Sequence, residues 1–238
     1  MTPKTPIAMT TQTTTLTKRT LLTAVLMGTL TFASGAIAAD NPKVKFATTE
    51  GDFVVELYPD LAPKTVENFL QYVKDKHYDG TIFHRVINDF MVQGGGFDAA
   101  YVQKKTRPPV VNEGRDAIAK GGPKNTVGTL AMARTNEPNS ATSQFFINVK
   151  ENTSLDATVI PPGDPVPKFE YGGRTYENVP RANLVNAPQL VGYAVFGKVI
   201  TGMDVVNKMK LTPTGAGGPF PSDVPKTQIL INSATLVK

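Results

Sequence analysis

The sequence predicts a mainly β domain, an all-β barrel or sandwich with helical caps. Seven or eight short runs have the alternation, or the β-branched and aromatic content, that is typical of strands. Only two segments have the apolar spacing of a helix. Strands and helices do not alternate along the chain and no internal repeat occurs, so neither a parallel α/β sheet nor a repeat protein is expected.

The first elements are a hairpin and a helix. Residues 44–48 and 53–57 are strand-like and are joined by Glu50-Gly51-Asp52, a turn signal. Pro63 can begin a helix, because the first helical N–H has no partner inside the helix. Apolar side chains follow at the i, i+3, i+4 and i+7 positions of one helical face: Val66, Phe69, Leu70 and Val73. We expect this face to pack on the sheet.

Residues 83–97 carry the strongest functional signal. Alternation in residues 83–87 and again in 91–93 predicts two strands, and Asn88-Asp89 between them predicts a turn. Arg85 and Gln93 are then polar groups on an otherwise apolar surface. Such a surface suits an apolar ligand with one polar group to be held, and a prolyl peptide bond is such a ligand.

The remaining strands are expected at residues 129–133, 144–149, 193–200 and 227–232. A second, shorter helix is expected at residues 203–209, just before the last strand.

One segment, residues 157–192, interrupts this pattern with six prolines. Inside it, strand-like residues 168–171 and 174–177 flank Gly172-Gly173, which predicts a two-residue hairpin. A connection of this length is more often functional or disordered than neutral. We refer to residues 157–192 as the insertion.

The first 38 residues have the features of a secretory signal peptide. Lys18-Arg19 supplies the positive region, residues 21–33 are mostly apolar, and Ala36-Ile37-Ala38 is a cleavage signal. The apolar run of roughly 13 residues is shorter than the ~20 that a spanning helix needs, so an uncleaved membrane anchor is the less favoured alternative. We therefore predict a cleaved leader, residues 1–38, and an exported domain, residues 39–238.

The formal net charge of +5 comes largely from this leader. Residues 40–238 hold 22 basic and 20 acidic residues, which does not predict a nucleic-acid footprint. The chain has no cysteine and only two histidines, His77 and His84, so neither a disulfide framework nor a zinc site is expected. No Gly-x-Ser-x-Gly motif or phosphate-binding loop occurs, and we expect no cofactor and no metal.

Several segments, in order and spacing, resemble the cyclophilin family of peptidyl-prolyl cis-trans isomerases. These segments are residues 83–97, 128–135, 139–148, 155–156 and 192–199. Together the resemblance covers residues ~43 to 238 apart from the insertion, and an ordered set of this kind is far more specific than one motif. The forms at residues 131–135 and 192–197 are most similar to the exported, periplasmic bacterial branch.

The resemblance implies a closed eight-stranded antiparallel barrel with an α-helix over each open end. It also implies a site. Arg85 matches the catalytic arginine of the family, with Phe90 and Gln93 beside it. The expected substrate-binding residues are Met91, Ala133, Arg134, Thr135, Gln144, Phe146, Leu155 and Tyr193. Ser154 stands where the best-known eukaryotic members have tryptophan, so weak cyclosporin sensitivity is expected.

The implied activity is rotation about Xaa-Pro bonds in exported proteins, which assists their folding without a nucleophile or a metal. The expected partners are proline-containing polypeptides, with no nucleic acid, no membrane insertion after cleavage, and a monomeric state. The alternative is a non-catalytic module, or holdase chaperone, that grips proline segments. The insertion either adds substrate contacts through Phe169, Tyr171 and Tyr176, covers the groove as a lid, or is surface decoration.

Overall fold

The structure is a computed structural model that describes residues 40–237. The predicted signal peptide, residues 1–38, lies outside the described residues. Within the described part, no helix is both long and apolar enough to cross a membrane.

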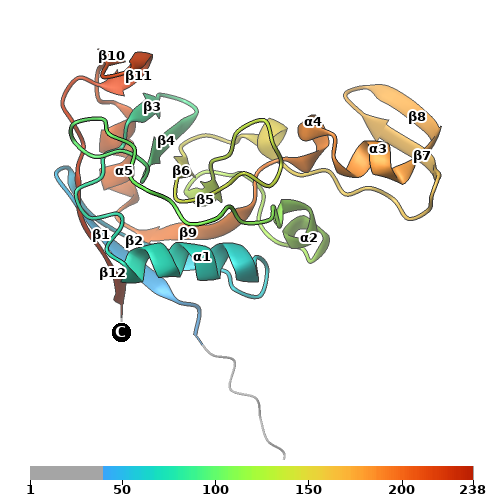
Figure 1. The fold of residues 1–238 in the computed structure, drawn as a ribbon, viewed down its shortest axis with the longest axis horizontal. Helices are drawn as coiled ribbons and strands as arrows, with labels where there is room; N and C mark the ends of the chain where they lie inside the picture. The colour runs from blue at the N-terminus through green and yellow to red at the C-terminus, as the bar shows by residue number, and fades with distance from the viewer. Residues whose placement is uncertain (1–39, 238) are drawn as a thin grey trace, which may run out of the picture. The chain divides into compact units, whose positions relative to one another are not determined.

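Eight strands form one antiparallel sheet in the order β12-β1-β2-β9-β5-β6-β4-β3 (Figure 1). They are β1 (Lys43–Thr48), β2 (Gly51–Leu57), β3 (Arg85–Ile87), β4 (Met91–Gly94), β5 (Thr129–Met132), β6 (Phe145–Asn148), β9 (Val195–Thr201) and β12 (Ile231–Val237). The predicted eight-stranded antiparallel fold is confirmed.

The word "closed" is too strong for this barrel. Its two edge strands, β12 and β3, meet through a single bridge between Ile82 and Leu230, outside both strands. Backbone hydrogen bonds of 2.9 Å from Phe83 N to Ile229 O and of 2.8 Å from Ile231 N to Thr81 O flank that bridge. Seven ladders therefore join neighbouring strands, and only a few hydrogen bonds join the β3 edge to the β12 edge.

Both predicted helices are present, as α1 (Pro63–Lys74) and α5 (Met203–Lys210). Figure 1 shows α1 running below β9 and α5 near β3 and β4. The start of α1 is held by the carboxylate of Glu113, which accepts hydrogen bonds from Lys64 N at 3.1 Å and Thr65 N at 2.8 Å. A carboxylate here satisfies two of the N–H groups that have no partner inside the helix, and it opposes the positive end of the helix dipole.

The core lies between the sheet and α1. It contains a group of fully buried aromatic side chains, among them Phe46, Phe53, Phe69, Phe145 and Phe196. The ring of Phe69, on α1, lies 5.0 Å from that of Phe196 and 5.7 Å from that of Phe145. The apolar face predicted for this helix is thus the face that packs on the strands.

Several elements were not predicted. These are α2 (Gly114–Ala119), the 3-10 turn η1 (Thr153–Leu155), and the hairpin of β10 (Thr214–Gly217) and β11 (Phe220–Pro225). The last strand begins at Ile231 rather than at residue 227, because the residues before it make the bridge that joins the sheet edges.

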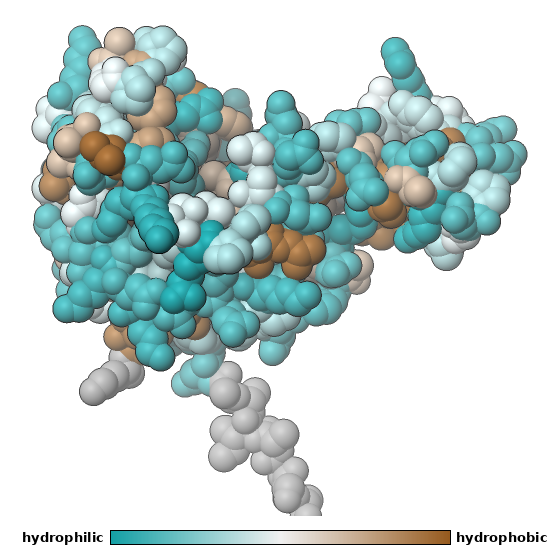
Figure 2. Space-filling view, in the orientation of Figure 1, coloured by the Kyte–Doolittle hydropathy of each residue, from teal (hydrophilic) through white to brown (hydrophobic). Residues whose placement is uncertain are grey.

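The insertion folds around its own small apolar cluster. The predicted hairpin is present as β7 (Val166–Tyr171) and β8 (Arg174–Val179), and it is followed by the short helices α3 (Arg181–Val185) and α4 (Pro188–Val191). Gly172 and Gly173 have φ values of 58° and 73°, which a two-residue turn of this kind requires. The buried residues of the cluster are Ile160, Val166, Phe169, Leu184 and Leu190. Figure 2 shows the insertion as a projection with a mostly hydrophilic surface.

Candidate active groove

The strand register places the main polar and apolar site residues in one row. Arg85 on β3 pairs with Gln93 on β4, Gln93 pairs with Phe146 on β6, and Phe146 pairs with Ala131 on β5. Directly paired residues of antiparallel strands project to the same face of a sheet. The ladder therefore brings a guanidinium, an amide and an aromatic ring side by side, with Met91 on the same face two residues before Gln93.

The polar side chains of the row form a hydrogen-bonded chain. Arg85 Nη1 donates to Gln93 Oε1 at 3.5 Å, and Gln93 Nε2 donates to Gln144 Oε1 at 2.9 Å. The second bond fixes the orientation of the Gln93 amide, so its oxygen is turned to Arg85. The Arg85 side chain remains 43% exposed and can reach a ligand.

A pocket of about 100 Å³ lies next to these hydrogen-bonded side chains, and we call it the apolar pocket because six of its nine lining residues are apolar or aromatic. Nine of the predicted site residues line it: Arg85, Phe90, Met91, Gln93, Ala133, Arg134, Phe146, Leu155 and Tyr193. Met91 and Phe146 are buried at its base, only 2% and 4% exposed, and the Tyr193 ring lies edge-on to that of Phe146 at 5.5 Å. The two other predicted residues, Thr135 and Gln144, line an adjoining hollow of about 300 Å³.

A buried amide network supports the pocket from behind. Asn152 Nδ2 donates to Phe90 O at 2.8 Å and to Asn148 Oδ1 at 2.7 Å. Asp156 Oδ1 accepts hydrogen bonds from Asn125 N at 2.7 Å and Asn125 Nδ2 at 3.0 Å. These bonds fix the backbone on both sides of η1, and with it the position of Leu155. Sequence reasoning did not identify this network.

Arg134 connects the pocket to the end of the insertion. Its Cζ lies 4.6 Å from the centre of the Tyr193 ring, an arrangement that favours a cation–π interaction. Arg134 Nε donates to Gly192 O at 3.0 Å and Nη2 donates to Pro188 O at 3.2 Å. One guanidinium thus fixes both the ring that lines the pocket and the backbone that enters β9.

The insertion itself does not reach the pocket. None of residues 157–192 lines the apolar pocket or the two hollows that adjoin it. Phe169 is only 5% exposed, and its ring lies 6.4 Å from that of Tyr171 and 6.1 Å from that of Tyr176. These aromatic side chains pack on one another within the insertion, and none of them lines the pocket. Substrate contacts through the insertion and its closure as a lid stay predictions.

A third hollow, of about 440 Å³, lies on the other side of Arg85. Its walls include His84, Phe97 and residues 220–223 of the hairpin that was not predicted. Burial lowers the pKa of His84 to about 4, so this imidazole is neutral at pH 7. Asp223 Oδ2 lies 3.8 Å from Arg85 Nε. No sequence signal pointed to Asp223, because its place depends on the fold of the hairpin.

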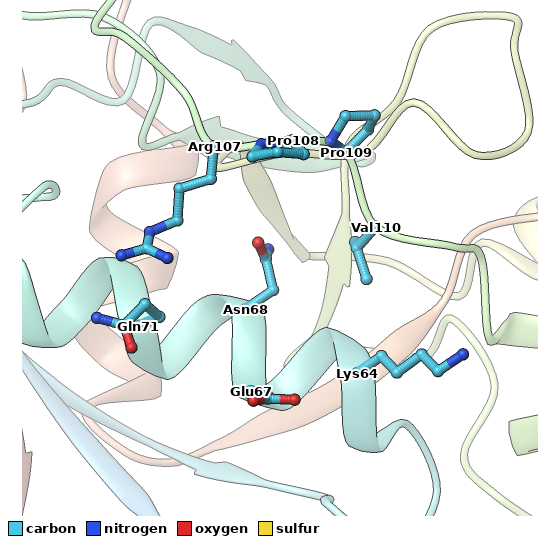
Figure 3. Close-up of a pocket in the computed structure, with 8 residues that line it drawn as sticks. All are labelled: Lys64, Glu67, Asn68, Gln71, Arg107, Pro108, Pro109 and Val110. Carbon is cyan, nitrogen blue, oxygen red and sulfur yellow. The ribbon is translucent and has the colours of Figure 1, made fainter.

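A separate depression lies between α1 and residues 107–110 (Figure 3). Five of its eight lining residues are polar or charged and three are apolar, and the Asn68 side-chain amide donates a 2.8 Å hydrogen bond to Thr142 O. Within residues 40–237, no group of three His, Cys, Asp or Glu side chains could hold a metal ion. The groove beside Arg85 is the candidate site because it gathers nine of the predicted site residues.

Comparisons with known proteins agree with this geometry. The family model for cyclophilin type peptidyl-prolyl cis-trans isomerase/CLD matches residues 43–236. Peptidyl-prolyl cis-trans isomerase B of Escherichia coli (strain K12) is 44% identical over 193 residues, 81% of this chain and 98% of that protein. Peptidyl-prolyl cis-trans isomerase A of Dickeya dadantii is 42% identical over 222 residues, 93% of this chain and 98% of that protein. A Cryptosporidium parvum cyclophilin crystal structure has a similar fold, with a TM-score of 0.50 and 24% identity over 83% of this chain and 98% of that chain.

Proposed function

The chain belongs to the cyclophilin-type peptidyl-prolyl cis-trans isomerase family, and we propose that its groove accelerates rotation about Xaa-Pro bonds in exported polypeptides and so assists their folding. The observation that carries the proposal is the position of Arg85. A guanidinium held by Gln93 stands at the edge of an apolar pocket.

The chemistry requires only modest stabilisation of a twisted bond. The barrier to rotation about Xaa-Pro is ~20 kcal/mol, which gives uncatalysed times of tens of seconds or more. About ten turnovers per second needs roughly three decades of acceleration, or about 4 kcal/mol. Binding and orientation by side chains can supply this, so no covalent step is required.

Arg85 is suited to act on the transition state alone. Twisting the C–N bond removes amide resonance and returns a lone pair to the imide nitrogen. Only then can the Arg85 guanidinium donate a hydrogen bond to that nitrogen, and a charge-assisted bond contributes about 1.5–3 kcal/mol. Because the planar state offers no such acceptor, the bond lowers the barrier rather than merely tightening substrate binding.

The apolar pocket contributes in a second way. A twisted amide has less charge separation than a planar one, so an apolar surrounding favours it. The proline ring would lie on Met91 and Phe146, with Phe90, Leu155 and Tyr193 around it. Gln93 holds Arg85 on one side, and the hollow beside Gln144 and Thr135 leaves room for the residues that precede proline.

Export is the finer part of the proposal. Its support is the leader, in which Lys18-Arg19 precedes an apolar run and an Ala-Ile-Ala cleavage signal. The clients would be proline-containing polypeptides of the periplasm, bound by a monomer. The nearly balanced charge of residues 40–238 gives no support for a nucleic-acid partner.

Cis/trans exchange of a short Xaa-Pro peptide, measured by NMR, tests the activity. The chain from Ala39 should accelerate exchange. Arg85→Ala should lose about tenfold to a hundredfold of that rate, the equivalent of one charge-assisted hydrogen bond. Arg85→Lys should also lose most of it while folding normally, because lysine lacks the planar fork.

Two results would contradict the proposal. If Arg85→Lys turned over like the wild type, the role of the guanidinium would be refuted. If neither the wild type nor the variants accelerated exchange, yet the peptide resonances shifted on binding, the chain would be a proline-binding module or holdase.

A further inference from the structure

The hairpin of β10 and β11 brings a carboxylate to the far side of Arg85. Asp223 Oδ2 lies 3.8 Å from Arg85 Nε, opposite the contact of Arg85 Nη1 with Gln93. Neither the sequence pattern nor the family resemblance pointed to this residue. Its placement follows from how the hairpin is fixed to the barrel.

The hairpin is anchored on both sides of Asp223. On one side the ring of Phe220 lies 5.4 Å from that of His84 and 5.1 Å from that of Phe97. On the other side Val224 is only 2% exposed. The position of the Asp223 backbone is therefore set by apolar contacts, and the carboxylate is carried to Arg85 by the rest of the fold.

Asp223 also has an uncommon backbone conformation, with φ of 64°. A left-handed conformation is unfavourable for most L-residues, and aspartate and asparagine tolerate it best. Such outliers tend to cluster at functional sites, where the surrounding structure holds them. Here the side chain of Asp223 lies beside Arg85, the residue on which the proposed mechanism depends.

Arg85 needs a second partner. Its side chain is 43% exposed, and its contact with Gln93, at 3.5 Å, is at the outer limit of a hydrogen bond. A long side chain with one weak contact occupies several rotamers, and each rotamer that points elsewhere reduces the fraction of productive encounters. The carboxylate 3.8 Å from Nε is beyond hydrogen-bond distance, but its charge attracts the guanidinium and adds an electrostatic restraint to the contact at Nη1.

We propose that Asp223 is a positioning residue for Arg85, which it holds through Nε so that Nη2 remains the donor to the imide nitrogen. In residues 40–237 the structure shows no protein partner for Nη2. Asp223 lines the hollow beside the apolar pocket and not the pocket itself, so it acts on the arginine without touching the proline ring. This inference rests on the proposed isomerase function.

The expected effect is on turnover, and it depends on salt. Both side chains are partly exposed, at 43% and 37%, so the ion pair is weak and is screened by ions. At low ionic strength, Asp223→Asn should lower kcat about twofold to fivefold and leave KM within about twofold. The difference from the wild type should shrink at about 1 M salt, where the Debye length is only about 3 Å.

The experiment measures kcat and KM for an Xaa-Pro peptide at both salt concentrations, with the Arg85 Nε–Hε NMR signal as a second readout. Asparagine tolerates the same backbone conformation as aspartate, so Asp223→Asn should fold. The matched control is Asp89→Asn. Asp89 also has a positive φ, 57°, and it lies in the exposed turn between β3 and β4. The Arg85 signal should change in Asp223→Asn and not in the control.

A double-variant cycle separates this inference from the proposed function. In an Arg85→Ala background, Asp223→Asn should have no further effect, because the two residues act as one unit. The inference is overturned if Asp223→Asn keeps wild-type kcat at low salt, or if it loses activity equally at both salt concentrations and in both backgrounds. If Arg85→Ala itself keeps wild-type activity, the proposed mechanism fails first.

Discussion

The barrel and the insertion differ in what holds their parts in place. In the barrel, backbone ladders fix eight strands around a cluster of fully buried aromatic rings. The insertion has one two-stranded ladder and a five-residue apolar cluster, and it is docked by an arginine side chain and a few backbone hydrogen bonds. Arg115 on α2 donates to Thr158 O at 2.9 Å, Val185 O at 3.2 Å and Leu190 O at 3.3 Å.

This difference bears on why the proposed site lies in the barrel. An arginine, an amide and an aromatic ring can be kept in one row when a ladder sets their register, and a one-residue slip would reverse every side chain. The two ends of the insertion, where it leaves and rejoins the barrel, are joined by backbone hydrogen bonds. Thr158 N donates to Leu190 O at 2.9 Å, and Tyr193 N donates to Leu155 O at 2.9 Å. A long segment can therefore be added beside Leu155 without disturbing the groove.

The largest expected effect is a loss of stability, and it should differ between the barrel core and the apolar cluster of the insertion. Phe69→Ala in α1 should cost about 3–5 kcal/mol of the free energy of unfolding, because it removes a fully buried ring and leaves a cavity. Phe169→Ala should unfold the insertion locally and change the global value far less. Urea denaturation, together with amide hydrogen exchange in each region, measures both. Equal global losses in the two variants would show that the barrel and the insertion unfold as one unit.

Lowering the pH should destabilise the barrel, since both histidines lie there and the insertion has none. Burial lowers the pKa of His84 from 6.5 to about 4. His84 binds a proton below about pH 6.5 in the unfolded chain but only below about pH 4 in the folded chain. The free energy of unfolding therefore falls as the pH falls through this window. Between pH 7 and pH 4.5 the loss from this group should be about 2 kcal/mol.

Denaturant titrations at the two pH values, on the wild type and His84→Asn, measure this contribution. The variant should lose less stability on acidification by about that amount. An identical pH dependence in both proteins would mean that His84 is not the group responsible.

A smaller effect should follow from loosening the insertion. Arg115→Ala removes three hydrogen bonds to backbone oxygens, so amide protection in residues 158–191 should fall by about tenfold or more. Turnover of a short peptide should stay within about twofold, because no residue of the insertion lines the apolar pocket. Arg174→Ala, at the exposed tip of the hairpin, is the control and should change neither quantity. A fall in peptide turnover for Arg115→Ala would show that docking of the insertion controls the groove.

Local signals predicted the parts of the fold that have strong patterns. Pro63 and the apolar spacing after it predicted α1, and alternation around Arg85 predicted β3 and β4 with their turn. Nine predicted site residues line one pocket, since the family resemblance transfers spatial information that spacing alone lacks. Their catalytic and binding roles stay predictions until the variants are measured.

The features that were missed depend on tertiary contacts. The hairpin of β10 and β11 is short and rich in Gly and Pro, and it is held by the packing of Phe220 on barrel side chains. The region around α2 contributes Glu113 to the start of α1 across 48 residues of chain. Asp223 meets Arg85 only because that hairpin folds back, so no local pattern could have indicated the pair.

One measurement tests most directly the claim that the barrel groove alone carries the activity. Residues 158–191 can be replaced by a short Gly-Ser link, because the Gly192 backbone lies directly against that of Ala157. Cis/trans exchange of an Xaa-Pro peptide is then measured by NMR with the full chain, the shortened chain, and the shortened chain carrying Arg85→Ala. We predict that the shortened chain keeps its rate within about threefold and that Arg85→Ala lowers it about tenfold to a hundredfold. A shortened chain that folds but does not accelerate exchange, or an Arg85→Ala variant as fast as its parent, would contradict the claim.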